Sequence, residues 1–125
     1  RLDAVIEAPI FAISDYKSCE NAETETFLRA AIKNGYDVQA AHYLNGMRAL
    51  HGINYVYLCI AQEKTPPYAV NVIQLDEPLI ERGGIILRRM LDTYHQCRET
   101  GNWYGYEGPD AQINVAMLPA WAAEE

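Results

Sequence analysis

The chain has 125 residues, of which 50% are hydrophobic and 22% are charged, so it is long enough for one modest core. This composition excludes a disordered tail, a collagen-like repeat and a coiled-coil rod, and the apolar runs fall short of a membrane span. The net charge of −7 argues against a surface that coats nucleic acid, so any contact with nucleic acid must be local. We therefore expect one soluble domain over residues 1–125.

The start of the chain and its cysteines indicate its context. The first residue is not Met, and Arg1-Leu2-Asp3 is typical of a strand rather than of a signal peptide. We expect the N-terminal part of the domain to be missing from this chain. The three cysteines form no CxxC pair, which argues against a zinc site and for a reducing cytoplasm.

The first elements are predicted to be a β-hairpin and a helix. Residues 2–7 and 10–16 are apolar and β-rich, and Ala8-Pro9 lies between them, where a proline removes no ladder hydrogen bond. Residues 21–34 have helical spacing, with acidic residues in the first turn, and Gly35 is a stop signal. The chain should therefore open with two paired strands and then turn helical.

A second helix is predicted over residues 37–50, and it is the clearest amphipathic helix of the chain. Gly52 follows its end. Apolar residues recur along one side at intervals of three and four, as a helix of 3.6 residues per turn requires. This stripe consists of Tyr36, Ala40, Tyr43, Met47 and Leu50.

Two further strands and a long helix follow. Residues 54–62 form a nearly continuous apolar run, which predicts a strand covered on both faces by helices, and residues 69–75 predict another strand. Asp76-Glu77-Pro78 supplies a cap, an acidic first turn and a proline allowed at a helix start, so a helix should run to Thr100. The order of elements predicts an α/β fold, a mixed β-sheet flanked by helices.

The hairpin can bring two carboxylates and an ammonium to one edge of the sheet. Asp3 lies on the first strand and Asp15-Tyr16-Lys17 end the second, where alternation sends Asp15 and Lys17 to the same face. Mg²⁺ takes one or two carboxylates and fills its other positions with water and substrate phosphate. A lysine beside it can orient a water or stabilise charge on a phosphorane-like transition state. A solvated surface ion pair is the alternative reading of Asp-x-Lys alone.

The second helix places Tyr36, Gln39 and Tyr43 on one face, because they are three and four residues apart. The Gln39 amide could donate to a phosphate or orient Lys17, and a tyrosine could stack on a base. Alternatively, both tyrosines belong to the core. Other groups are expected to have structural roles: the scattered histidines, the helical arginines, and the aromatic cluster at residues 103–106, which we expect to close the core.

Taken together, these motifs resemble the PD-(D/E)xK nuclease superfamily, and more narrowly the RecE-type exonucleases, the exodeoxyribonuclease VIII C-terminal nuclease domain and its phage relatives. Asp3 and five segments in one order carry the resemblance: residues 13–18, 36–43, 63–68, 100–103 and 118–122. The resemblance spans nearly the whole chain. One departure is Tyr104, which stands where the family usually has proline after the tryptophan.

The resemblance implies a restriction-endonuclease-like core and a Mg²⁺-dependent exonuclease that degrades linear double-stranded DNA from 5′ ends, leaving 3′ single strands for recombination. Asp3, Asp15 and the Tyr16 backbone carbonyl would bind Mg²⁺, for which Mn²⁺ can substitute. Lys17 would be the catalytic lysine, and Gln39, Tyr43 and Tyr36 would support the site. A further His or Glu ligand would come from an upstream helix, which this sequence does not include.

The resemblance also implies partners: double-stranded DNA ends, further copies of the chain in a ring, and a single-strand annealing recombinase. Two other functions remain open at this point. One is a nuclease-derived binding or interaction module without turnover, and the other is a different PD-(D/E)xK repair or restriction endonuclease. An iron-sulfur nuclease is disfavoured, because the three cysteines form no cluster in the sequence.

Overall fold

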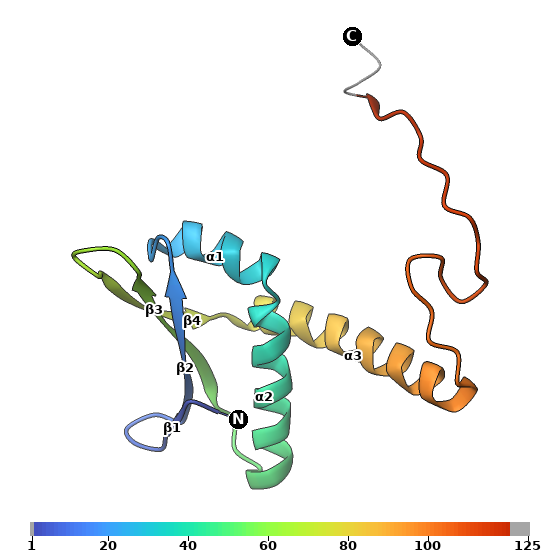
Figure 1. The fold of residues 1–125 in the computed structure, drawn as a ribbon. Helices are drawn as coiled ribbons and strands as arrows, with labels where there is room; N and C mark the ends of the chain where they lie inside the picture. Colours follow the sequence, from blue (N-terminus) through green and yellow to red (C-terminus); the bar gives the residue numbers. More distant parts are fainter. Residues whose placement is uncertain (1, 121–125) are drawn as a thin grey trace. The chain divides into compact units, whose positions relative to one another are not determined.

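A computed structural model describes residues 2–120 of the chain. Four strands, β1 (Ala4–Ile6), β2 (Ala12–Cys19), β3 (Val56–Glu63) and β4 (Val70–Leu75), form one sheet in the order β1-β2-β3-β4 (Figure 1). The central β2–β3 pair is parallel, and the two outer pairs are antiparallel. The predicted mixed sheet and opening hairpin are therefore confirmed.

The chain divides into two compact units, residues 1–89 and residues 90–125, and each is described by itself. The first unit holds the whole sheet, α1 (Thr24–Lys33), α2 (Tyr36–His51) and the first half of α3 (Glu77–Thr100). Within residues 2–120, no helix is both long enough and apolar enough to cross a membrane.

The ends of β2 and α1 differ from the prediction for local reasons. β2 continues to Cys19, three residues further than expected, because its parallel pairing with β3 extends to the Cys19–Glu63 pair. Helix α1 begins at Thr24 rather than at residue 21, because Glu23 is its N-cap. The Glu23 carboxylate accepts hydrogen bonds from the backbone N–H groups of Glu25 and Thr26, which satisfies two free donors of the first turn.

Helix α2 lies between two glycines in the left-handed conformation, Gly35 with φ of 70° and Gly52 with φ of 68°. Only glycine adopts this conformation without strain, so the two residues end α1 and α2 sharply. The predicted stripe of α2 is correct except at its end: Leu50 is 78% exposed. The fifth position of the stripe is therefore not part of the core.

The core lies between α1 and α2 and one face of the sheet (Figure 1). It is made of inward residues of the strands together with alanines and Phe27 of the helices: Ile13, Tyr57, Cys59, Ala61, Ile73, Leu75, Ala22, Phe27, Ala31, Ala40 and Tyr55. On the other face, Leu58 and Ile60 are half-buried and Val72 is exposed. The expectation that β3 is covered by helices on both faces is wrong for the described residues.

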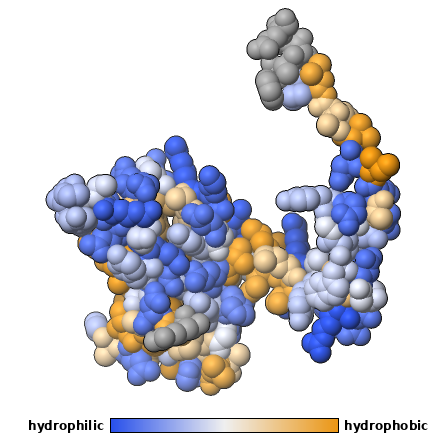
Figure 2. Space-filling view, viewed as in Figure 1, coloured by the Kyte–Doolittle hydropathy of each residue, from blue (hydrophilic) through white to orange (hydrophobic). Residues whose placement is uncertain are grey.

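Helix α3 has the bounds predicted from its cap and its stripe. In the second unit, the Trp103 ring meets the Tyr94 ring edge-on at 5.8 Å between centroids, but both side chains stay largely exposed. The expected core closure by the aromatic cluster is therefore wrong, because Tyr106 is fully exposed as well. The chain beyond is a hydrophobic stretch (Figure 2) with these exposed side chains: Ile113, Val115, Met117 and Leu118. Trp121 and Ala122 of the motif at residues 118–122 lie outside the described residues.

Candidate functional site

Strand β2 carries a buried carboxylate on the face that the helices cover. Every second residue of β2 points to this face, namely Ile13, Asp15 and Lys17. The β3 residues opposite Asp15 and Lys17 are the buried Cys59 and Ala61. Asp15 is only 4% exposed. Ionised carboxylates are rarely buried without a partner, so this position requires a compensating positive charge.

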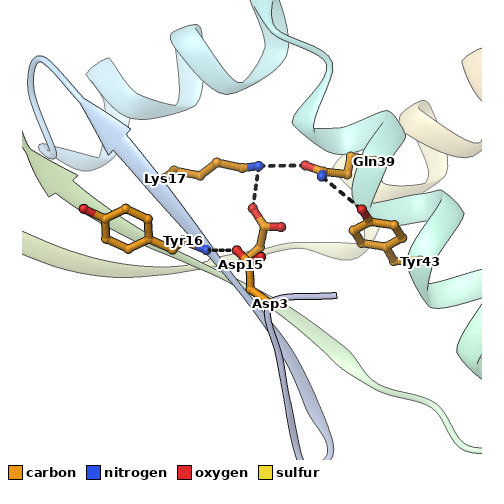
Figure 3. A network of polar contacts seen from close by, with 6 residues as sticks. All are labelled: Asp3, Asp15, Tyr16, Lys17, Gln39 and Tyr43. Atoms are coloured by element: carbon orange, nitrogen blue, oxygen red, sulfur yellow. Dashed lines mark hydrogen bonds and ion pairs between the residues drawn. The ribbon is translucent and has the colours of Figure 1, made fainter. Parts of the chain in front are cut away.

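Lys17 supplies that charge. Its Nζ forms an ion pair with Asp15 Oδ2 and donates a hydrogen bond of 2.8 Å to Gln39 Oε1 (Figure 3). It also lies 4.3 Å from the centroid of the Tyr36 ring. The ammonium is therefore surrounded by a carboxylate, an amide oxygen and the negative face of an aromatic ring. Three contacts from two elements hold this flexible side chain in one place.

Helix α2 presents Gln39 to Lys17 in a defined orientation. Gln39 Nε2 donates to the Tyr43 hydroxyl at 3.4 Å, four residues further along the helix, while its Oε1 accepts from Lys17. Both the nitrogen and the oxygen of this amide group therefore form hydrogen bonds. The structure brings Lys17, Gln39 and Tyr43 together around Asp15 (Figure 3), and Tyr36 also contacts Lys17.

Asp3 lies just before β1 at the same edge of the sheet. Its Oδ2 accepts a hydrogen bond of 2.9 Å from the backbone N–H of Tyr16 (Figure 3). The β1–β2 register pairs Ala4 with Ser14, and continued by one residue it sets Asp3 opposite Asp15 on the same face. Asp3 is exposed and Asp15 is buried, so one carboxylate faces solvent and the other faces the core.

Tyr16 contributes only its backbone to this face. Its side chain points to the opposite face of the sheet, where its hydroxyl donates to Gln62 Oε1 at 2.8 Å. The Tyr16 carbonyl lies between Asp15 and Lys17 in the chain, where the sequence prediction put a third oxygen donor.

Tyr57 is a site neighbour that sequence reasoning missed. Its side chain is almost fully buried, and no described residue gives its hydroxyl a hydrogen bond. Burial and the nearby Asp15 carboxylate raise the pKa of Tyr57, so the hydroxyl stays protonated. The residue pairs with Ile13 across the sheet, two pairs before Asp15 and on the same face, and only the β2–β3 register reveals this. The sequence shows it as one more apolar position of a β-rich run.

The oxygen donors at this edge fit a hard divalent cation. Asp15 Oδ2 is buried and pairs with the Lys17 ammonium. Within the same described residues, no group of three or more His, Cys, Asp or Glu side chains could hold a metal ion. Two carboxylates with water and phosphate are a usual set for Mg²⁺, whereas zinc usually requires three or four protein ligands.

Comparison with known proteins agrees with this geometry. Residues 1–111 match the family described as "PDDEXK-like domain of unknown function (DUF3799)". The structure is similar to a crystal structure of a protein from Eubacterium rectale named "Putative exonuclease", with a TM-score of 0.56 and 18% sequence identity. The match covers 86% of this chain and 44% of that protein, so this chain spans less than half of its length. No curated protein matches the sequence significantly. At this identity the likeness concerns the fold, and it confirms the expected restriction-endonuclease-like α/β core.

Proposed function

Because the chain belongs to the PDDEXK-like family DUF3799, we propose that it is the catalytic core of a metal-dependent DNA nuclease. In its finer form the proposal is an exonuclease of the RecE type, which degrades linear double-stranded DNA from 5′ ends and leaves 3′ single strands for recombination. The observation that carries the proposal is the buried Asp15–Lys17 pair, held by Gln39 and placed beside Asp3.

Asp3 and Asp15, with the Tyr16 carbonyl, are the groups that would hold Mg²⁺ or Mn²⁺. A bound divalent cation would supply a water of lowered pKa and neutralise charge on the scissile phosphate. Two carboxylates suffice for Mg²⁺, since this ion retains several waters. The further His or Glu ligand that the family resemblance implies would complete the same site.

Lys17 is the residue that we assign to catalysis. An ammonium has three N–H donors, of which one faces Asp15 and one faces Gln39. The third can serve a water molecule or a phosphate oxygen. Because Asp15 and Gln39 orient the ammonium before substrate arrives, its charge needs little reorganisation when negative charge develops on the phosphate.

The acidic net charge of the chain is compatible with DNA binding if the positive charge is concentrated at the site. With a net charge of −7, the chain as a whole repels DNA, so the positive charge must be local. Bound cations and Lys17 would provide it at the site. We propose that several copies surround the DNA end in the cytoplasm and that a single-strand annealing recombinase receives the product strand.

The test is digestion of end-labelled linear duplex DNA in Mg²⁺ by the wild-type chain and by Asp15→Asn and Lys17→Ala. We expect early release of a 5′ label, resistance of circular duplex, and loss of digestion in both variants and after chelation of Mg²⁺. Asp92→Asn and Lys33→Ala are matched controls, because both side chains are exposed and lie outside the site.

Undiminished digestion by both site variants would refute the site assignment. If the wild-type chain binds duplex ends but does not cleave them in Mg²⁺ or Mn²⁺, it is a binding module with a nuclease fold. Early release of a 3′ label would refute the RecE-type polarity and leave the coarser nuclease proposal standing.

A further inference from the structure

We propose that Arg82 and Gly83 of α3 are positioning residues for Lys17 and act through the first turn of α2. The inference rests on the proposed function of Lys17. It concerns two residues outside the nuclease motifs, more than 60 positions from Lys17 along the chain. Three observations within residues 1–89 support it.

The first observation is an ion pair between the buried Asp37 of α2 and the half-exposed Arg82 of α3. Asp37 lies in the first turn of α2 with its side chain 1% exposed, and its Oδ2 pairs with Arg82 Nη1. Its other carboxylate oxygen has no hydrogen-bond partner among the described residues. The N-cap, Gly35, gives the helix no side-chain hydrogen bond. Arg82 therefore gives this end of α2 a polar contact with α3, in addition to the contacts of Tyr36 and Gln39 with Lys17.

The second observation is a backbone contact at the next residue. A Cβ added to Gly83 would lie 2.1 Å from the carbonyl oxygen of Asp37, 2.4 Å from its carbonyl carbon and 2.9 Å from the nitrogen of Val38. These are backbone atoms of α2, so they can yield only if the first turn itself moves. The absence of a side chain at Gly83 thus sets the distance between the two helices.

The third observation links this turn to Lys17. Asp37 lies between Tyr36 and Gln39 in the sequence, and both of these residues contact the Lys17 ammonium. The first turn of α2 therefore carries two of the three groups that surround Nζ. A shift of the turn changes both contacts at once, while Asp15, on β2, stays where it is.

A matched pair of glycines makes the inference testable. Gly83 and Gly84 are adjacent in α3, but a Cβ at Gly84 would have no atom within 4 Å outside its own helix. Gly83→Ala should therefore displace the first turn of α2, and Gly84→Ala should not. Both changes replace a glycine in a helix interior by the same residue, so their effects on helix propensity are alike.

The readout is the NMR signal of the Lys17 side chain in the whole chain labelled with ¹³C-lysine. The chain has three lysines, so the signal missing from Lys17→Arg identifies it. We expect an upfield ε-proton shift in the wild type from the Tyr36 ring, retained in Gly84→Ala and reduced in Gly83→Ala. An unchanged signal in a folded Gly83→Ala variant would overturn the inference.

Arg82 provides a second test if Gly83→Ala does not fold. Arg82→Ala should weaken the same upfield shift, and Arg82→Lys, which retains a charge for Asp37, should restore most of it. Arg88→Ala, an exposed arginine on the same helix, is the control. Equal Lys17 signals in Arg82→Ala and the wild type would contradict the proposed role of Arg82.

Turnover gives an independent measurement. A misplaced ammonium lowers kcat, by up to roughly 100-fold, with little change in KM. Equal losses in Gly83→Ala and Gly84→Ala would overturn the inference. These results are separable from a failure of the proposed function: active Lys17→Ala refutes the catalytic role, whereas the Lys17 signal reports its position whether or not DNA is cleaved.

Discussion

Lys17 Nζ donates a hydrogen bond of 2.8 Å to Gln39 Oε1, and this bond joins β2 to α2 across 22 positions of the chain. Neither residue could hold this geometry by itself, because both side chains are long and flexible. The ion pair with Asp15 restrains one partner and the Tyr43 hydroxyl restrains the other. The candidate site is therefore a connection between the sheet and the second helix, and it can be tested one link at a time.

Replacing Gln39 by Ala should lower turnover more than stability. The Lys17 ammonium loses one of the contacts that orient it, and a misplaced catalytic group costs up to about 100-fold in rate, so we expect kcat to fall about tenfold or more. The measurement is single-turnover digestion of linear duplex DNA together with urea unfolding. Asn45→Ala, an exposed change on the same helix, serves as the control. Wild-type turnover in a folded Gln39→Ala variant would contradict the role given to this amide.

Tyr57→Phe should leave the free energy of unfolding unchanged or raise it by up to about 1 kcal/mol. The Tyr57 hydroxyl is buried and has no hydrogen-bond partner among the described residues. Folding therefore removes its hydrogen bonds to water without replacing them, which costs free energy. Urea unfolding of the two proteins measures the difference. A loss of more than about 1 kcal/mol would mean that the hydroxyl has a partner in solution, for which the nearby Asp15 carboxylate is the candidate.

Glu23→Ala should destabilise the protein at neutral pH but not in acid. Hydrogen bonds from the first turn of α1 lower the pKa of Glu23 from its ordinary value of 4.5. A depressed folded pKa means that the stabilisation is present above pH 4.5 and disappears as the pH falls through the lower, folded value. Unfolding midpoints of the variant and the wild type should differ at pH 7 and converge at about pH 3.

The control for this prediction is Glu7→Ala, an exposed carboxylate outside the helices. It should shift the midpoint little at either pH, because it caps no helix. A Glu23→Ala difference that is the same at both pH values would show that the charge of the N-cap is not the stabilising factor.

Phe27→Ala should be among the most destabilising changes in the first unit. The ring is buried at the centre of the core that joins α1 to the sheet, and truncating a buried phenylalanine costs about 3–5 kcal/mol. Ile32→Ala, on the exposed side of the same helix, should cost about 0.5 kcal/mol or less. Urea unfolding measures both. Similar losses in the two variants would contradict the described orientation of α1.

Cysteine alkylation checks the burial of β3. Burial, together with the nearby Asp15 carboxylate, raises the pKa of Cys59 to about 11, so the thiol is protonated at neutral pH. We expect iodoacetamide at pH 8 to modify the half-buried Cys19 before Cys59 in the native protein. Mass spectrometry of the digested protein distinguishes the two. Faster modification of Cys59 would show that this part of the sheet opens readily.

Features that depend on local geometry could be predicted from the amino-acid order alone. Alternation along a strand put Asp15 and Lys17 on one face, and helical spacing put Gln39 and Tyr43 on one face of α2. The left-handed Gly35 and Gly52 ended two helices where their residue type indicated. Each of these follows from backbone periodicity within about ten residues, so no knowledge of distant partners was needed.

Which faces of the strands and helices pack against one another depends on contacts between distant parts of the chain. Strand order and the β2–β3 register placed the Tyr57 hydroxyl beside Asp15, and the packing of α3 on α2 paired Arg82 with Asp37 and brought Gly83 against the backbone. The exposed face of β4 and the exposed aromatic residues after α3 likewise depend on what lies opposite them. Such relations join positions tens of residues apart, and they are set by the packing of whole elements rather than by any local pattern.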